Sequence, residues 1–342
     1  MASLVKRAHA QSMWTVERIV HFEPGDFVND GLAHFGFHDP RGRLFAIDHA
    51  EHILALVRDG GRVEWTVAAE RIAPGVRNVT AALSFPMYAD LLADGSLIVS
   101  NFGNPHLYRV DMHTMKAELL VDGVAIGMTD MGNCAVDADG FIWVNEVRGC
   151  RVWRFDPTGR PVLTLGNGEP GFQRDATSFD DARFSWIYDL RLGPDGLVYV
   201  LDSRNYALRV VDLAAREVRT VAGTGEPGYS GDGGDPREAT FGGDEWARFD
   251  GPISLALDED GNAFVGDRFN HVVRMIDWKR NVVTTIAGRA DADDTHPNPP
   301  TERDPMRLNL PQISSMDYDR GRLFVPTDFD GEAGDLAVLR RA

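Results

Sequence analysis

The stretch LRLGPDGLVYVLDSRNYALRVVD, from Leu190 to Asp212, decides the fold of this chain. It reads as an apolar strand, a tight turn ending in Gly196, a second strand, a polar corner and a third strand that ends in Asp. A second clear copy, LALDEDGNAFVGDRFNHVVRMID, runs from Leu255 to Asp277. The same frame surrounds four more turn glycines: Gly42, Gly95, Gly140 and Gly321. Successive turn glycines lie 45 to 65 residues apart, a spacing too long for a solenoid rung and typical of propeller blades.

The second strand of the repeat indicates how these units pack. In GLVYVLD, which begins at Gly196, Leu, Tyr and Leu on one face alternate with two Val on the other. Both faces are apolar, as expected where each sheet is covered by its neighbours. A fourth strand follows the third, for example REVRTVAG ending at Gly223. The pattern predicts an all-β fold, a six-bladed β-propeller with four-stranded antiparallel blades, and residues 1–342 as one domain.

The two ends of the chain indicate how the ring closes. The last repeat ends after its third strand, in DLAVLRRA. The stretch WTVERIVHF, residues 14–22, is strand-like and belongs to no complete repeat. We therefore expect this N-terminal strand to close the last blade, and its deletion to be a severe lesion.

Composition restricts the partners. The formal net charge of −17 disfavours nucleic acid and anionic membranes, which both require a basic surface. The N-terminus lacks the apolar stretch of a secretory signal, and no segment approaches the roughly 18 apolar residues of a membrane span. The two cysteines, Cys134 and Cys150, fall on strands too far apart for a disulfide and are predicted to be free and buried. We expect a cytoplasmic protein that acts on a small molecule, with no nucleic-acid or membrane partner.

One loop and the repeat after it point to a family. TVAGTGEPGYSGDGG, residues 220–234, followed by the copy around Gly261, resembles consecutive bacterial NHL repeats. The likeness covers the middle and C-terminal half of the chain, and the first, second and sixth repeats diverge from it. The resemblance implies a six-bladed propeller. It implies no single activity, because NHL proteins include enzymes and binding scaffolds.

Two recurring motifs are interpreted as structural. The Gly patterns at 166–171 and 223–228 match G-x-G-x-x-G, but no helix follows to hold a pyrophosphate, so we expect blade-to-blade loops. The Asp and Asn of DSRN (202–205) and DRFN (267–270) recur in two blades. This repetition predicts corners in which short polar side chains bind backbone groups.

The candidate site comes from positions where the repeats differ. Aligned on the turn Gly, the first strands should line the central axis, and their inner positions are Tyr88, Asn133, Asp189 and Ser254, then Asp90, Ala135, Arg191 and Ala256. The divergent first and sixth repeats supply His34 (or Ala33) and Ile313. Packing alone would require apolar or small residues at most of these inner positions, so this number of polar side chains needs another explanation. They form either a plug or a wet channel, with Asp90 paired to Arg191 across the axis, or a ligand site.

A second ring is expected at the corners between strands two and three. Its members of interest are His49, Glu146, Arg204 and Arg268, with Tyr188 nearby on a first strand. Long Arg side chains at such corners can reach inward and bind a carboxylate or phosphate. Exposed, solvated corners are the structural alternative.

These rings favour an enzyme that hydrolyses a lactone or ester at the mouth of the channel. The general base activating water would be His34 or Asp189, and Arg191 or Arg204, helped by Tyr88 or Tyr188, would stabilise the oxyanion. The substrate-binding set is His49, Asp90, Asn133, Glu146, Tyr188, Arg204 and Arg268. A lyase or isomerase using the same base, and a scaffold that binds a protein or peptide on its rim, stay open as alternatives.

A second resemblance concerns metal. The chain is similar in fold to gluconolactonase-type propellers, which hold one divalent cation with Glu, Asn and Asp on inner strands. The matching places here fall nearest Ala33, Gly132 and Tyr188, which cannot supply such ligands. One position later stand His34, Asn133 and Asp189, which can. A single Ca²⁺, Zn²⁺ or Mn²⁺ on this set is therefore an open alternative.

Overall fold

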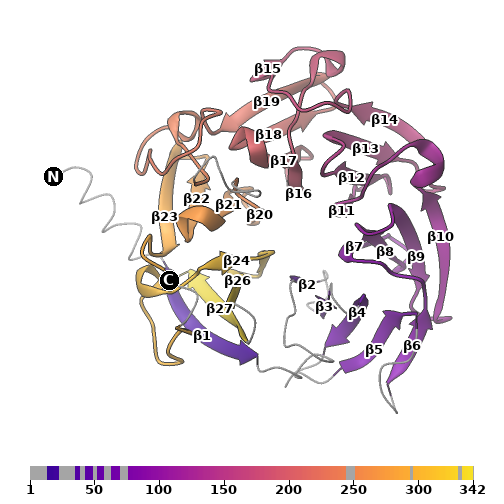
Figure 1. The fold of residues 1–342 in the computed structure, drawn as a ribbon, viewed down its shortest axis with the longest axis horizontal. Helices are drawn as coiled ribbons and strands as arrows, with labels where there is room; N and C mark the ends of the chain where they lie inside the picture. Colours follow the sequence, from indigo (N-terminus) through magenta and orange to yellow (C-terminus); the bar gives the residue numbers. More distant parts are fainter. Residues whose placement is uncertain are drawn as a thin grey trace.

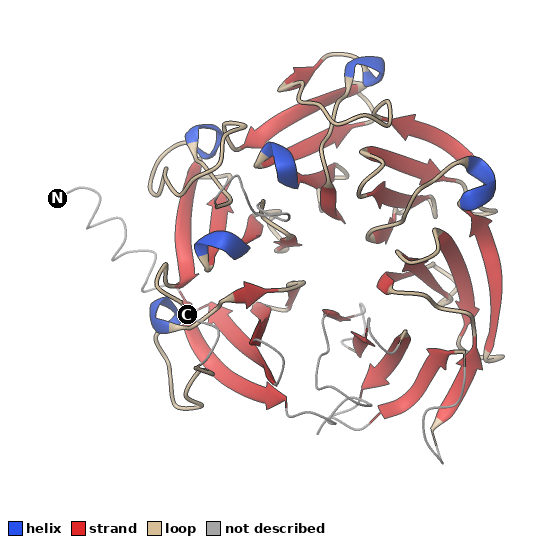
Figure 2. Ribbon diagram, in the orientation of Figure 1, coloured by secondary structure: helices blue, strands red, loops and turns tan. Residues whose placement is uncertain are grey.

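The computed structural model describes residues 14–22, 35–38, 43–48, 52–57, 63–69, 76–243, 251–292, 296–329 and 333–341. Six sheets stand around a common centre like the blades of a wheel, which confirms the six-bladed β-propeller (Figure 1). Strands carry nearly all of the regular structure, and the described helices are single 3-10 turns (Figure 2). None of these described helices is long and apolar enough to cross a bilayer.

Each blade begins with an inner strand next to the centre and proceeds outward through antiparallel neighbours (Figure 1). Blade one holds β2 (Phe35–His38), β3 (Leu44–Asp48), β4 (Ile53–Val57), β5 (Val63–Ala68) and β6 (Arg77–Thr80). Blade two holds β7 (Pro86–Leu91), β8 (Leu97–Asn101), β9 (His106–Asp111) and β10 (Lys116–Asp122). Blade three holds β11 (Cys134–Val136), β12 (Ile142–Glu146), β13 (Arg151–Phe155) and β14 (Pro161–Leu165).

The remaining blades follow the same plan with additions. Blade four holds β16 (Ile187–Leu192), β17 (Val198–Asp202), β18 (Ala207–Asp212) and β19 (Glu217–Ala222), with β15 (Asp175–Ala176) outside it. Blade five holds β20 (Ser254–Leu257), β21 (Ala263–Asp267), β22 (Val272–Asp277) and β23 (Val282–Gly288). Blade six holds β24 (Gln312–Ile313), β25 (Asp317–Asp319), β26 (Arg322–Phe329), β27 (Ala333–Arg341) and β1 (Trp14–Phe22). The extra strands β6 and β15 were not predicted, because loop residues form them.

The predicted closure is confirmed. Strand β1 pairs antiparallel with β27, from Trp14 opposite Arg341 to Phe22 opposite Gly334. Trp14 is only 1% exposed, and its ring meets that of Phe264 edge-on at 5.4 Å. The ring is thus closed by hydrogen bonds and apolar packing between the two ends of the chain.

The corner prediction is also confirmed. Asn205 Nδ2 donates to Asp202 Oδ2 at 2.8 Å, and Asn270 Nδ2 donates to Asp267 Oδ2 at 2.8 Å. Each carboxylate also accepts a backbone N–H, from Ser185 and from Gly242 respectively. These groups build the turn between the second and third strands of blades four and five, and we assign them no chemistry.

The two Gly-rich motifs are loops, as predicted. Gly223 and Gly225 have φ of 95° and 97°, a region that side-chain-bearing residues rarely adopt. A Cβ at Gly223 would lie 2.2 Å from the carbonyl oxygen of Tyr206, so the backbone packs too closely for any other residue. The next helical segment is a 3-10 turn, Pro236–Glu238, and not the α-helix of a dinucleotide fold.

Cys134 and Cys150 are free and buried, as predicted. Burial raises the pKa of the Cys134 thiol to about 12. The thiol is therefore protonated and unreactive at neutral pH.

Candidate functional site

The inner strands bring the predicted axial residues together. Tyr88 lies on β7, Asn133 directly before β11, Asp189 on β16 and Ser254 on β20. All four are buried. Side chains two residues apart on a strand share a face, so Asp90 follows Tyr88 and Arg191 follows Asp189 in a second layer, nearer the hairpin turns.

Asp189 is held by four hydrogen bonds. Its Oδ1 accepts from Asn133 Nδ2 at 2.5 Å and from the backbone N–H of Leu190 at 2.8 Å. Its Oδ2 accepts from the backbone N–H of Leu255 at 2.8 Å and from Arg191 Nη2 at 3.3 Å. A carboxylate has about four acceptor positions, and all four are filled here. Abstraction of a proton by Asp189 would therefore require at least one of these bonds to break.

Arg191 lies across the centre of the ring. Its Nε donates to the carbonyl of Leu255 in blade five at 2.9 Å, and Nη2 reaches the carbonyl of Met316 in blade six at 3.5 Å. Its guanidinium stands 4.2 Å from the ring centroid of Tyr88 in blade two. The matching position of blade three is occupied by the small residue Ala135, which pairs with Trp143. An Arg–Asp ion pair is present at the axis, but Arg191 forms it with Asp189, where the sequence suggested Asp90.

In the sixth blade, the predicted alignment of the inner positions is wrong. Ile313, expected on the axis, is fully buried in an apolar cluster. The hairpin of this blade pairs Asp319 with Arg322 and leaves two residues in the turn, whereas blade two pairs Leu91 with Leu97 and leaves five. Counting back from the turn Gly therefore gave the wrong inner residue in blade six. The structure puts Asp317 in the second layer and Ser315 in the first.

Three axial carboxylates bind neighbouring blades in the same way. Each accepts the backbone N–H of the next inner strand: Asp90 from Val136 at 2.8 Å, Asp189 from Leu255 at 2.8 Å and Asp317 from His38 at 2.7 Å. Blades two and three, four and five, and six and one are thus joined in pairs. Part of the polar character of the axial residues therefore has a structural role, because these three carboxylates join neighbouring blades.

Some axial polar atoms are unpaired within the described part of the chain. These buried atoms are Asn133 Oδ1, Arg191 Nη1 and Ser315 Oγ. An unsatisfied buried donor or acceptor costs about 1–3 kcal/mol, so a native protein satisfies it with water or a ligand. Exposure also rises from the first layer to the second: the Asp189 side chain is 2% exposed, Arg191 12% and Asp317 15%.

The described residues do not fit a divalent cation. They contain no cluster of three or more His, Cys, Asp or Glu side chains that could hold a metal. Asn133 turns its amide nitrogen toward Asp189, whose own oxygens are filled. His34, the third expected ligand, lies outside the described residues, as does His49.

The predicted corner residues lie at the opposite end of the inner strands from the second layer. Glu146 is buried inside blade three, where Thr129, Arg151 and Trp153 donate to both of its oxygens. Glu146 occupies the same corner position as Asp202 and Asp267, at the end of the second strand. This equivalence was not predicted, because the residue type differs.

Three further corner-side residues are held by neighbours. Arg204 stacks on the Trp186 ring at 4.3 Å, and Tyr188 packs against the same ring at 6.4 Å. Arg268 donates to Gln312 Oε1 at 2.5 Å. The structure therefore separates the predicted set into an axial cluster and a corner group.

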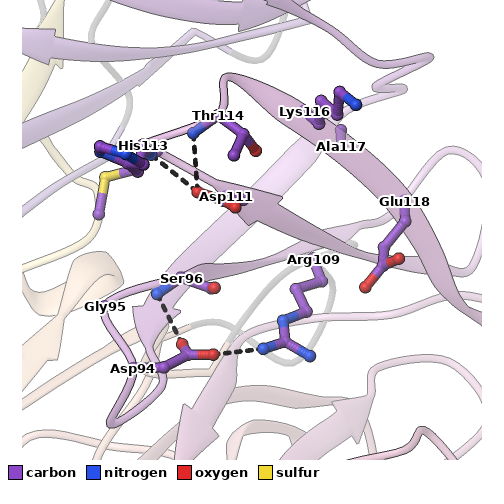
Figure 3. A pocket seen from close by; sticks show the side chains of 11 residues that line it. Asp94, Gly95, Ser96, Arg109, Asp111, His113, Thr114, Lys116, Ala117 and Glu118 are labelled. Carbon is purple, nitrogen blue, oxygen red and sulfur yellow. Dashed lines mark hydrogen bonds and ion pairs between the residues drawn. The ribbon is translucent and has the colours of Figure 1, made fainter.

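A hollow of about 520 Å³ opens on blade two, between its two hairpin turns (Figure 3). Arg109 forms an ion pair with Asp94 there, and Asp111 accepts the backbone N–H of His113 and Thr114. These bonds shape the turns. None of the predicted site residues lines this hollow.

Buried carboxyl groups predict how the stability of the fold depends on pH, and burial raises the pKa of Asp189 among them. Burial raises the pKa of Asp90, Asp202 and Asp267 from 3.8 to about 6. The folded state thus binds these protons more tightly, so their stabilising effect is complete below about pH 4 and lost as pH rises through about 6. Each contributes roughly 2–3 kcal/mol. In urea unfolding, stability should rise between pH 7.5 and pH 5.

Two variants isolate the effect. Asp90→Asn should reduce this change in stability, because one of the buried carboxyl groups that gain a proton in the folded state no longer titrates. Asp156→Asn is the matched control: hydrogen bonds, first from Thr158, lower the pKa of Asp156 to about 2, outside the window. A stability that falls from pH 7.5 to pH 5 would contradict the prediction.

Comparisons with known proteins place the fold. No family model matches the chain. The curated protein SUPPRESSOR OF QUENCHING 1, chloroplastic, of Arabidopsis thaliana is 30% identical over 123 residues, which span 34% of this chain and 11% of that protein.

Solved structures match nearly the whole chain. An auxiliary nutrient binding protein from Bacteroides thetaiotaomicron has a TM-score of 0.62 at 14% identity, covering 95% of this chain and 76% of that one. Virginiamycin B lyase from Staphylococcus aureus has a TM-score of 0.56 at 10% identity, covering 94% and 98%. At these identities the likeness establishes the fold alone. The chain is a six-bladed β-propeller whose structural neighbours include a lyase and nutrient-binding proteins.

Proposed function

We propose that this protein is a small-molecule enzyme that opens a lactone or ester at the axial cluster, with Arg191 and Asp90 as its principal groups. One observation carries the proposal: a guanidinium is fixed across the centre of the ring, and its Nη1 has no partner among the described residues. Asp90, Asp189 and Asp317 interact electrostatically with it. A preorganised donor of this kind stabilises an oxyanion, which is often the largest contribution to catalysis.

For hydrolysis, Asp90 takes a proton from water while the water oxygen bonds to the carbonyl carbon. Arg191 Nη1 donates to the resulting oxyanion. The carbon–oxygen bond of the ester then breaks, and the leaving alkoxide receives the proton from Asp90, so the products are an acid and an alcohol.

Asp90 suits the base role better than Asp189 does. Each Asp90 oxygen accepts one backbone N–H, from Leu91 or Val136, whereas both Asp189 oxygens accept two hydrogen bonds. A pKa of about 6 keeps Asp90 ionised at neutral pH and basic enough to take a proton. Asp189 is then a positioning residue that orients Arg191 and Asn133.

Elimination is the alternative reaction at the same groups. Asp90 would remove a proton from the carbon next to a carbonyl, a carbon–carbon double bond would form, and the carboxylate on the next carbon would leave with its electron pair. The streptogramin B lyase structure supports this alternative, because it matches 94% of this chain and 98% of its own, a domain of the same extent.

A second candidate is a binding protein without chemistry. The corner face carries aromatic rings stacked with guanidinium groups, Arg204 on Trp186 at 4.3 Å and Arg148 on Phe102 at 4.9 Å. Arg guanidinium groups recognise carboxylates and phosphates, so this surface suits an anionic ligand. Nutrient-binding proteins among the structural neighbours favour this candidate.

Membership of the NHL-repeat family is part of the proposal. Its support is the repeated corner, in which a buried Arg on the third strand pairs with the Asp that ends the second: Arg209 with Asp202 at 2.8 Å, and Arg274 with Asp267 at 3.8 Å. The proposal also includes a single domain and a small-molecule partner. It further includes a cytoplasmic location, with which the two free thiols are consistent.

Kinetics on a panel of lactones and esters tests the proposal. Arg191→Met should lower kcat/KM by about 10²–10³-fold, because an oxyanion donor is lost. Asp90→Asn should abolish the rise of kcat/KM through about pH 6. Mass spectrometry separates the reactions, since hydrolysis adds one water to the substrate and elimination adds none.

Ser254→Ala is the matched control. Ser254 Oγ accepts the backbone N–H of Met316 at 2.6 Å, so this variant also loses an axial bond between blades but no charge. It should lower the melting temperature and leave kcat/KM near that of the wild type. His34→Ala and His49→Ala extend the panel to the remaining predicted residues. No turnover of any compound, or losses that merely follow melting temperature, would reject the enzyme.

A further inference from the structure

The charges along the axis do not balance. In the described part of the chain, the carboxylates of Asp90, Asp189 and Asp317 all interact electrostatically with one guanidinium, that of Arg191. Arg191 forms its ion pair with Asp189 at 3.3 Å. Among the described side chains it is also the only cation that lowers the pKa of Asp90. One positive charge therefore faces three carboxylates, and the excess charge is negative.

Asp317 carries part of this excess where a ligand can reach it. Its side chain lies in the second axial layer, on β25, and is 15% exposed. Its Oδ2 accepts the backbone N–H of His38 at 2.7 Å and a bond from His38 Nδ1 at 2.8 Å. Its Oδ1 has no hydrogen bond to a residue that the structure describes. A carboxylate oxygen in this position is satisfied by water or by the N–H groups of a ligand.

A second acceptor is unsatisfied in the first layer. Asn133 is 2% exposed, its amide nitrogen donates to Asp189, and its Oδ1 has no partner among the described residues. The other unpaired axial atoms in the described chain are Arg191 Nη1, which can only donate, and Ser315 Oγ, which can donate or accept. A ligand that satisfies this set carries N–H donors and one acceptor for Arg191.

We propose that the axial site selects esters or lactones that carry a protonated amino group, which Asp317 Oδ1 binds while Arg191 holds the ester carbonyl. This inference rests on the proposed function and names its substrate class. An ammonium group has three N–H donors and a positive charge, and the carbonyl oxygen is the acceptor that Nη1 lacks. A carboxylate on the substrate would instead be repelled by Asp90 and Asp317.

The surroundings of the axis favour the same class of substrate. The second-layer positions of blades three and five hold Ala135 and Ala256, which carry no charge to offset the carboxylates. The whole chain has a formal net charge of −17. A channel lined by one sign of charge raises the local concentration of the opposite sign, and salt weakens this effect. Cationic substrates are therefore favoured during approach as well as in the bound state.

Kinetics with three matched ethyl esters tests the inference. The neutral ester is that of butyric acid, the cationic one that of γ-aminobutyric acid, and the anionic one the half ester of succinic acid. At about pH 7.5 Asp90, with a pKa of about 6, is ionised. The value of kcat/KM should be highest for the cation and lowest for the anion, with the cation about 10–100-fold above the neutral ester. Raising the ionic strength from about 0.01 to about 0.5 M should reduce this ratio.

One variant and one matched control assign the preference to Asp317. Asp317→Asn keeps an oxygen that can accept the backbone N–H of His38, and should reduce the ratio of cationic to neutral ester to within about threefold. Because both esters are measured on the same sample, the ratio does not depend on the fraction of folded protein. Asp156→Asn removes one carboxylate from the surface turn before β14 and should leave the ratio unchanged.

The outcomes separate this inference from the proposed function. Hydrolysis without a preference for the cation, or a preference that Asp317→Asn leaves intact, overturns the inference and leaves the enzyme. If no ester is hydrolysed, the proposed function fails, and NMR titration with butylammonium, compared with butyrate, measures recognition alone. Saturating shift changes at residues 315–319 that occur only with butylammonium and are lost in Asp317→Asn support ammonium binding. Their absence overturns it.

Discussion

Deletion of residues 14–22 should leave no folded, soluble monomer. The deletion removes all nine residues of β1 and exposes the edge of β27 together with the apolar cluster of blade six. A domain of this kind is stable by only about 5–15 kcal/mol, and loss of a whole strand with a buried Trp exceeds this margin. Soluble yield, circular dichroism and gel filtration measure the outcome.

Further variants make the result specific. A permuted chain, in which residues 14–22 follow Arg341 through a short turn, should fold, because Trp14 already lies opposite Arg341. The single variant Trp14→Ala should cost about 3–5 kcal/mol, and Thr15→Ala, which is exposed, less than about 0.5 kcal/mol. A deletion variant that melts like the wild type would show that another segment closes the ring.

Arg209→Met should be the most destabilising single change at a corner. Both Arg209 and Asp202 are fully buried, and Nη1 donates to Asp202 Oδ2 at 2.8 Å. The same guanidinium donates to the backbone carbonyls of Arg183 and Gln173, so it also fixes the loop that leads into β16. Removing it leaves a buried carboxylate and three backbone carbonyls, of Arg183, Gln173 and Arg174, without this donor, at a cost of about 3–5 kcal/mol.

Arg237→Met is the matched control. Arg237 forms a pair of the same length, 2.8 Å, with Asp175, but the two side chains are 42% and 44% exposed. Water screens such a pair, so the loss should be no more than about 1 kcal/mol. Urea unfolding of both variants measures the difference. Equal losses would mean that burial does not govern the strength of these ion pairs.

The repeat was enough to predict the fold. Alternating apolar residues, Asp-Gly turns and the lone strand at residues 14–22 are local signals, and each depends on contacts that recur in every blade. The same regularity predicted the corners of blades four and five, because Asp202 and Asp267 recur at matched positions. It failed for Glu146, which fills that corner with a different residue and so looked like part of a site.

The axial cluster was predicted in part. Tyr88, Asn133, Asp189 and Arg191 converge as the alignment indicated, because period-two alternation fixes which side chains face the centre. Asp317 was not predicted. The inner positions were located by counting back from the turn Gly, and the two-residue turn of blade six shifts that count.

By itself, then, the sequence determined the number of blades, the closing strand and the ring of inner positions, because these follow from repeated local patterns. Only the tertiary structure decided which axial group each side chain binds. Arg191 joins Asp189 and the carbonyl of Leu255, and Asp90 binds the backbone of Val136. The bonds to Leu255 and Val136 join residues of different blades that are 64 and 46 positions apart in the chain, and no local pattern encodes them.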